Sequence, residues 1–345
     1  MASMKNQKNW ILAVLVAVVA LNLGWAHQTL LIPELDLTEY YHFGAREPLV
    51  YRILPALFYH AIMNVHGEVL TGLNAPLSSS SSIFQLLMDA VSLATTLVFL
   101  RKIVARLNPQ LHPALTLAFA SGMELVIVVF GYFMVPNRAL FYPYDFPDLC
   151  LATVIFYLAI RLAGPAEYLL PVAIFIATFN KETAVFYSGL YAAFRIGRQA
   201  DWRRTVTVLA LCAATFLAAR KTVIWLVHRL NSGVHIVNQQ YELHLSYTLA
   251  QLRNPLFVFA MLNVCSYLYV AIYLLRRRFD RTDVCILLLI GGWFTIMATV
   301  GVVRELRIFV PASLMMFVII ARHLDAIVRT WAPALSADRG RMPVI

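Results

Sequence analysis

The sequence predicts an all-α, polytopic membrane protein. Of its 345 residues, 61% are hydrophobic and only 13% are charged, and the mean hydropathy is +0.72. Apolar runs long enough to cross a bilayer as a helix, which takes about 20 residues, recur along the chain. A transmembrane β-barrel is excluded because its strands would alternate apolar and polar residues, whereas these runs are continuously apolar.

Ten apolar runs are expected to cross the membrane as helices. The first follows Lys5 and Lys8. It is too long for a signal peptide and ends without a small-residue cleavage site, so we interpret it as a retained anchor. The predicted spans are residues 10–31, 82–100, 111–135, 147–163, 167–179, 183–196, 205–227, 255–275, 283–303 and 308–330. They form one transmembrane domain, residues 1–331, and we expect the tail, residues 332–345, to be disordered and cytoplasmic.

Basic residues recur in alternate connections between these spans. They are Arg101, Lys102 and Arg106; Arg161; Arg195, Arg198, Arg203 and Arg204; and Arg276, Arg277, Arg278 and Arg281. The positive-inside rule places this side, and with it both termini, in the cytoplasm. Most acidic residues fall on the other side. Because acids contribute little to topology, orientation does not explain that bias.

Two long segments, residues 32–81 and 228–254, lie on the outer side in this topology. The first contains an apolar stretch, Leu49–Met63, that Arg52, Pro55 and His60 interrupt. We expect it to form an interfacial helix. An eleventh crossing there would move every later basic cluster outside.

The segment after the first span carries candidate catalytic carboxylates. Asp36 and Glu39 follow the span directly, and Glu47 lies further along the same loop. A carboxylate at the outer surface can take a proton from an alcohol, which is the general-base step of transfer to a hydroxyl. The alternative is that these acids only solvate a loop.

Cations on the outer side are candidates for binding a phosphate. Guanidinium groups hold phosphate oxygens in bidentate fashion and lysine adds a point charge. Interfacial anchoring is the alternative for Arg304 and Arg307, and snorkelling is the alternative for Arg220. The candidate phosphate-binding residues are Arg46, Arg52, Lys181, Arg304 and Arg307.

Two short polar segments interrupt the apolar runs. One is Asn180-Lys181-Glu182-Thr183, and the other, around Tyr142–Asp148, contains Asp145 and Asp148. Charges at such positions are costly unless they are paired or wetted by a cavity, which favours a functional role. The same argument applies to Asp89 and Glu124 inside spans, where a hydrogen bond to a neighbouring helix is the rival interpretation.

Several other chemistries are disfavoured. The histidines show no metal-ligand spacing, and the four cysteines lie inside apolar runs without a C-x-x-C pair, so we expect no metal site and no disulfide. No phosphate-binding glycine-rich motif is present, which disfavours nucleotide chemistry. The net charge of +10 is explained by membrane orientation, so no nucleic-acid partner is predicted.

The layout resembles the GT-C superfamily of membrane glycosyltransferases. The stretch Glu47-Pro48-Leu49-Val50-Tyr51-Arg52 is similar to a P-x-x-Y-R element of small bacterial members, and Asn180–Thr183 is similar to their N-(R/K)-E-(T/S) element. The first loop lacks the adjacent paired acids of some subfamilies, so the base and the acceptor both stay open.

The resemblance implies transfer of a sugar from a polyprenyl-phosphate carrier to a hydroxyl of a glycan, lipid or protein, at the outer face of a bacterial inner membrane. Asp36 would be the base, with Glu39 beside it, and the outer cations would hold the leaving phosphate without an obligate metal or other cofactor. Tyrosines and polar residues of the same loops would contact the substrate. These are Tyr40, Tyr41, Glu47, Tyr51, Asp145, Asp148, Asn180 and Glu182.

Two other functions remain open. A polymerase or ligase that moves a lipid-linked oligosaccharide would use the same outer arginines. In a transporter or flippase, Asp89, Glu124, Arg220 and Lys221 would line a substrate or proton path. The sequence shows neither paired halves nor glycine-interrupted spans in matching positions, and this counts against a transporter.

Overall fold

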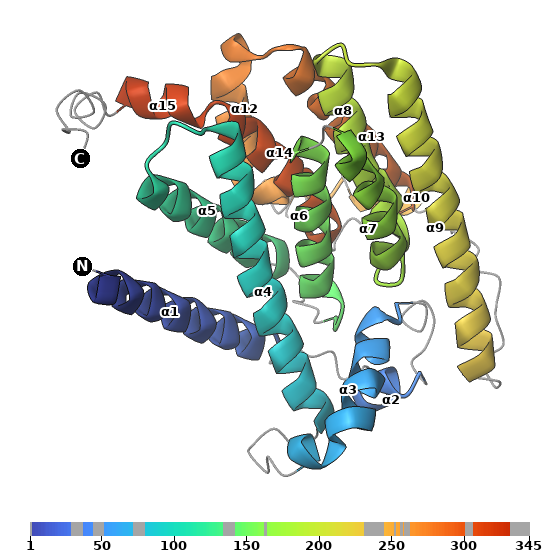
Figure 1. The fold of residues 1–345 in the computed structure, drawn as a ribbon. Coiled ribbons are helices and arrows are strands. Elements are labelled where there is room, and N and C mark those ends of the chain that lie inside the picture. The colour runs from blue at the N-terminus through green and yellow to red at the C-terminus, as the bar shows by residue number, and fades with distance from the viewer. Residues whose placement is uncertain are drawn as a thin grey trace.

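The computed structural model describes residues 2–28, 37–43, 52–71, 80–133, 142–161, 164–230, 245–251, 253–255, 258, 263–300 and 306–331. Throughout these ranges the regular structure is helical (Figure 1). The first half of the chain contains α1 (Ala2–Gln28), α2 (Leu37–Tyr41), α3 (Leu54–Thr71), α4 (Ser80–Leu107), α5 (Pro113–Val128), η2 (Val129–Phe133) and α6 (Asp145–Arg161).

The second half contains α-helices of varied length and several 3₁₀ turns. They are η3 (Gly164–Tyr168), α7 (Leu169–Thr178), η4 (Glu182–Ser188), α8 (Gly189–Gly197), α9 (Trp202–Leu230), α10 (Leu245–Gln251), η5 (Val264–Tyr267), α12 (Leu268–Leu275), η6 (Arg276–Arg278), α13 (Arg281–Val300), η7 (Leu306–Phe309), α14 (Val310–Arg322) and α15 (Leu324–Trp331).

Among the described residues, four helical stretches are long and apolar enough to cross a membrane. They are Ser81–Leu107, Pro113–Phe133, Trp202–Leu230 and Arg281–Thr299. A fifth is possible if α14 and α15, which meet at 54°, form one broken span. The chain is therefore a helical membrane protein, as predicted, whereas ten crossings remain a prediction. The shorter pair η3–α7 extends only about 25 Å at ordinary helical rises, against a hydrocarbon core of about 30 Å.

The main core is built around α14. Every residue from Val310 to Ala321 is buried, as expected for a helix that is apolar on all sides. Helices α8 and α13 pack closely because Gly189 and Gly197 face α13; a Cβ on Gly197 would lie 2.7 Å from the Cα of Thr282.

A second, aromatic core lies where α2 and α3 pack against the start of α4 and the end of α9. Tyr41 stacks on Tyr59 with ring centroids 4.8 Å apart, and Phe84 meets both rings edge to face. Helix α3 confirms the predicted helix in part. It begins at Leu54 rather than Leu49, with Pro55 in its first turn, where a missing N–H costs nothing.

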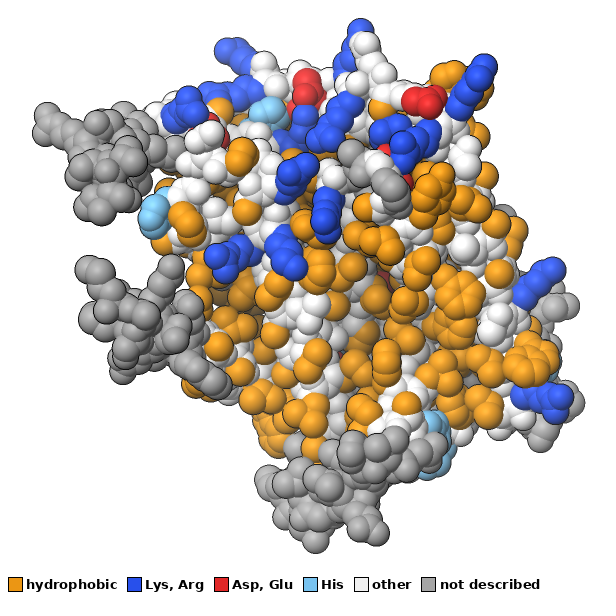
Figure 2. All heavy atoms as spheres, in the orientation of Figure 1, with side chains coloured by type: hydrophobic (Ala, Val, Ile, Leu, Met, Phe, Trp, Pro, Cys, Tyr) orange, Lys and Arg blue, Asp and Glu red, His pale blue; other side chains and the backbone are white. Residues whose placement is uncertain are grey.

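The surface separates into an apolar belt and a basic end. Exposed apolar side chains cover the flanks of the long helices, among them Val91, Val98, Val206, Leu217 and Leu288. On the face in Figure 2, most Lys and Arg side chains gather at the end where α4 terminates and α9 begins. Helix α6 runs from Asp145 to Arg161, so its two ends are separated by about 24 Å. Asp145 and Arg161 therefore mark two well-separated levels of the molecule.

Candidate functional site

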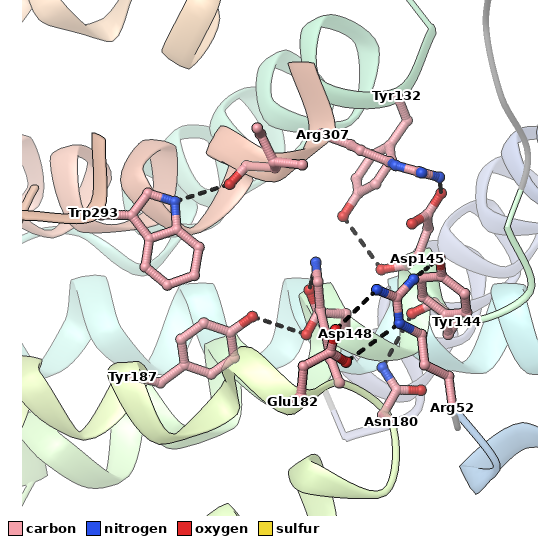
Figure 3. A network of polar contacts seen from close by, with 12 residues as sticks. Arg52, Tyr132, Tyr144, Asp145, Asp148, Asn180, Glu182, Tyr187, Trp293 and Arg307 are labelled. Atoms are coloured by element: carbon pink, nitrogen blue, oxygen red, sulfur yellow. Dashed lines mark hydrogen bonds and ion pairs between the residues drawn. The ribbon is translucent and has the colours of Figure 1, made fainter. Parts of the chain in front are cut away.

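The candidate site surrounds the amino-terminal end of α6, far from the basic end. Ion pairs there join segments that are distant in the sequence (Figure 3). We call this group the α6 network. It comprises Arg52, Tyr144, Asp145, Asp148, Lys181, Glu182 and Arg307.

Arg52 enters from the loop before α3. Its Nη2 lies 3.2 Å from Oε1 of Glu182, and its Nη1 donates a hydrogen bond to the hydroxyl of Tyr144. The guanidinium also covers the Tyr144 ring, 4.2 Å from its centroid. The backbone is fixed on both sides, because Tyr40 on α2 donates to the carbonyl of Arg52 and the Leu54 N–H donates to Phe179. Three contacts therefore hold this guanidinium.

Lys181 and Glu182 occupy the turn between α7 and η4. Lys181 has an extended backbone, so its side chain and that of Glu182 diverge. The Lys181 Nζ lies 2.8 Å from Oδ2 of Asp148, and the Tyr187 hydroxyl donates to Oδ1 of Asp148 over 2.8 Å. Asn180 donates to the carbonyl of Tyr144 over 3.1 Å, which ties this turn to the start of α6.

Arg307 enters from η7, next to α14. Its Nη1 lies 3.5 Å from Oδ2 of Asp145, and its guanidinium carbon is 3.3 Å from the centroid of the Tyr142 ring. The turn itself is fixed by Trp293 on α13, whose indole N–H donates to the carbonyl of Ile308 over 2.8 Å. Arg307 is thus held on a turn that two helices position.

The carboxylates of this network stay ionised because cations face them. Burial alone would raise the pKa of Glu182, but the charge and hydrogen bonds of Arg52 lower it from 4.5 to about 2. Burial likewise opposes ionisation of Asp145, yet Arg307 and His27 bring its pKa below the ordinary value. A general base works best with a pKa near the working pH, so neither carboxylate suits that role.

Arg52 and Arg307 are close enough to interact electrostatically. Burial and the charge of Arg307 both disfavour the charged form of Arg52, and Glu182 outweighs them, so the pKa of Arg52 is raised. Like charges brought together by three separate segments are a typical feature of an anion site. A carboxylate engages at most two of the five donors of a guanidinium, so a paired arginine can still bind a phosphate oxygen.

A second polar chain lies behind the α6 network and was largely missed from the sequence. His27 on α1 is buried between Asp89 on α4 and Asp145. Gln85 donates to Oδ1 of Asp89 over 2.6 Å and accepts a hydrogen bond from Tyr41. The sequence signal for His27 was weak, since a lone histidine at the end of an apolar run also fits a position at the membrane interface.

The sequence-predicted site residues fall into two groups. The structure brings together Arg52, Asp145, Asp148, Asn180, Lys181, Glu182 and Arg307, and it places Tyr40 and Tyr41 in the adjoining aromatic core. The side chain of Glu39 and all of Asp36, Arg46, Glu47, Tyr51 and Arg304 lie outside the residues that the structure describes.

Three aromatic residues of the site were not singled out from the sequence. Tyr144 and Tyr187 donate or accept hydrogen bonds in the network, and Tyr142 lies under Arg307. The tyrosines flanking Pro143 were a usable signal, because they precede Asp145 in a polar break between apolar runs. Within the part of the chain that the structure covers, no group of three or more His, Cys, Asp or Glu residues is arranged to hold a metal ion.

Comparison with known proteins gives no further guidance. No family model, no curated protein and no solved structure matches this chain.

Proposed function

We propose that this protein is an integral-membrane glycosyltransferase of the GT-C type. It would move a sugar from a polyprenyl-phosphate carrier to a hydroxyl acceptor. The observation that carries the proposal is the convergence of Arg52, Lys181 and Arg307 at one end of α6, each oriented by its own carboxylate. These residues belong to three segments that more than a hundred positions separate, so local sequence does not explain their meeting.

The cations would act on the leaving group. As the acceptor oxygen bonds to the anomeric carbon, the bond from that carbon to the phosphate oxygen breaks and the electron pair leaves with the lipid phosphate. Prearranged donors stabilise such developing charge because they need no reorganisation during the reaction. Arg52 and Arg307 meet that requirement, since ion pairs and aromatic rings hold both guanidinium groups.

The acceptor proton would go to Asp36 or Glu39. The paired carboxylates Asp145 and Glu182 have lowered pKa values, so they are poor bases. Asp36 lies four positions before Tyr40, which hydrogen-bonds to the backbone of Arg52.

The proposed setting is a bacterial plasma membrane, with ten crossings, both termini in the cytoplasm and the α6 network on the outer side. The basic end supports this orientation through the positive-inside rule. Single cysteines placed near Arg203 and near Gln251, labelled by an impermeant thiol reagent in intact cells after removal of the native cysteines, test it. We expect labelling near Gln251 and none near Arg203. The opposite pattern would show that the protein has the reverse orientation.

The activity is tested with purified protein, a radiolabelled polyprenyl-phosphate sugar and an acceptor extract. We expect release of the carrier phosphate together with a labelled product, and loss of both in Arg52→Gln. Arg195→Gln is the matched control, because Arg195 also pairs with a buried carboxylate, Glu167, but at the basic end. If wild-type protein consumes no lipid-linked sugar or oligosaccharide, the proposal fails.

A transporter is the second candidate, and the buried His27–Asp89–Asp145 group favours it. Ionisable residues inside a membrane protein often mark proton or ion paths. Solute uptake into proteoliposomes, driven by a pH gradient and abolished in Asp89→Asn, would establish transport. A lipid-linked oligosaccharide as the preferred donor in the first assay would instead indicate a polymerase or ligase.

A further inference from the structure

The imidazole of His27 is enclosed between two carboxylates that belong to different helices. Its Nδ1 lies 3.7 Å from Oδ2 of Asp89 on α4, and its Nε2 lies 3.6 Å from Oδ2 of Asp145 on α6. His27 and Asp89 are 0% exposed and Asp145 is 2% exposed. The faces of the ring are covered by aromatic side chains, with the Phe146 centroid 4.3 Å away and the Tyr132 centroid 5.9 Å away.

Both carboxylates are fixed by further contacts. Gln85 donates to Asp89 over 2.6 Å and to the carbonyl of Pro143 over 3.1 Å. The backbone carbonyl of Asp145 accepts a hydrogen bond from the Tyr132 hydroxyl over 3.2 Å, and its carboxylate faces Arg307. Among the residues that the structure describes, Asp89, Asp145 and Tyr132 are titratable groups that face His27 from the helices around it.

This geometry suits protons better than a metal ion. A metal needs its ligands to converge on one point, whereas here two different ring nitrogens face two separate carboxylates. A neutral imidazole has one N–H and one lone pair, so one of its nitrogens would direct that lone pair at a carboxylate. A second ring proton removes this conflict. The positive charges of His27 and Arg307 then balance the negative charges of Asp89 and Asp145, as buried charges require.

We infer that His27, Asp89 and Asp145 form a buried proton-binding site that positions the α6 network. His27 and Asp89 are positioning residues: the bound proton holds Asp145, and Asp145 holds Arg307. The site also ties the end of α1 to α4 and α6. The consequence for sugar transfer rests on the proposed function, whereas the bound proton does not.

The proton is detected by nitrogen NMR of protein labelled at histidine, in detergent at pH 7.5. We expect the spectrum of the nine histidines to contain a doubly protonated ring signal that belongs to His27. That signal disappears in His27→Gln and loses one proton in Asp89→Asn. His323→Gln is the matched control, because His323 lies 2.9 Å from the carboxylate of Asp283 at the basic end. If His27→Gln loses no doubly protonated signal, or if wild type shows none, the inference is overturned.

The positioning role is tested by transfer kinetics in the same variants. We expect Asp89→Asn to raise the KM for the donor by about 10- to 100-fold and to alter the pH profile, because a displaced Arg307 binds phosphate less well. His323→Gln should leave KM and the pH profile unchanged. Unchanged kinetics in a folded Asp89→Asn protein overturn the role.

The two failures are distinguishable. If wild-type protein transfers no sugar while the NMR signal is present, only the proposed function fails. If transfer occurs and the signal is absent, only the proton-binding site fails. Asp89→Asn keeps the shape of the side chain, so it serves as the readout if His27→Gln does not fold.

Discussion

Two networks of ion pairs lie at different levels of this molecule, and they are built differently. At the basic end, Glu167 pairs with Arg195 and Arg204, while Asp280 and Asp283 pair with Arg322 and His323. We call these residues the basic-end network. Its members sit where helices end or begin, and residues that pair with each other are no more than 42 positions apart.

The α6 network differs in where its partners come from. Arg52 and Glu182 are 130 positions apart, and Arg307 and Asp145 are 162 apart. Its cations stand on loops and short turns, and the guanidinium groups of Arg52 and Arg307 lie 4.2 and 3.3 Å from aromatic ring centroids. At the basic end, Arg195 and Arg322 stand on helices and lie 5.9 and 5.7 Å from theirs. A buried ion pair is by itself weak evidence of function. Convergence of loop residues from distant segments, with two guanidinium groups close over aromatic rings, distinguishes the α6 network.

The largest expected difference between the networks is in sugar transfer. Arg52→Gln should reduce the transfer rate by about 10²- to 10³-fold, the usual effect of removing one preorganised donor. Arg195→Gln removes a similarly buried cation from its ion pair with Glu167, and it should leave the transfer rate of the folded protein near that of wild type. The rates are measured with radiolabelled donor on detergent-purified samples of equal secondary structure. Equal losses in both variants would break the distinction between the networks.

A difference in acid sensitivity should follow from Glu182. Its pKa is lowered from 4.5 to about 2 in the folded protein, which corresponds to roughly 3 kcal/mol of stability. Because the folded pKa is the lower one, this contribution is fully present above pH 4.5 and is lost as the pH falls towards 2. Thermal unfolding of wild type and Glu182→Gln between pH 3 and 7 measures it. The difference in unfolding temperature between wild type and Glu182→Gln should become smaller as the pH falls. A difference that does not change with pH would contradict the expectation.

A matched pair of tyrosines separates stability from function. Tyr187 donates to Asp148 in the α6 network, and Tyr191, one helical turn later, donates to Glu167 in the basic-end network. Each change to Phe should cost about 1 kcal/mol of unfolding free energy, the net value of one hydrogen bond. Only Tyr187→Phe should also weaken donor binding. Loss of donor binding in Tyr191→Phe would show that the site extends to the basic end.

The smallest effect is expected at Asp280. Arg322 lowers the pKa of Asp280 to about 2, but 56% of this side chain is exposed and solvent screens the pair. Asp280→Asn should therefore change the unfolding free energy by less than about 1 kcal/mol and leave transfer unchanged. Chemical denaturation measures the unfolding free energy, and the radiolabel assay measures the transfer rate. A large loss of stability would mean that Asp280 and Asp283 act together as one unit in binding Arg322.

Helical membrane architecture was predictable because it depends on composition and on the length of apolar runs. The predicted helix near Leu49 shifted to Leu54 because Pro55 sets the first turn, a local effect that the sequence contains. The membership of the α6 network was also largely predictable. Lys181, Glu182, Asp145 and Asp148 interrupt apolar runs, where charge is costly and therefore informative.

The pairing within the network was not predictable. Glu182 faces Arg52 rather than the adjacent Lys181, and Lys181 faces Asp148, because an extended backbone at Lys181 directs the two side chains apart. His27, Tyr144 and Tyr187 were not singled out from the sequence. A tyrosine or histidine at the end of an apolar run suits either an interface or a core, and only the packing of α4 and α6 distinguishes them.

The sequence by itself determined that the chain forms apolar helices, which residues interrupt them with charge, and at which end the basic residues gather. These properties follow from hydropathy and from the high cost of placing charge in lipid. The tertiary structure decided which carboxylate holds which cation, and it buried His27 between Asp89 and Asp145. Those contacts join α1, α4, α6 and η7, and such long-range partners depend on how helices pack, which no local pattern encodes.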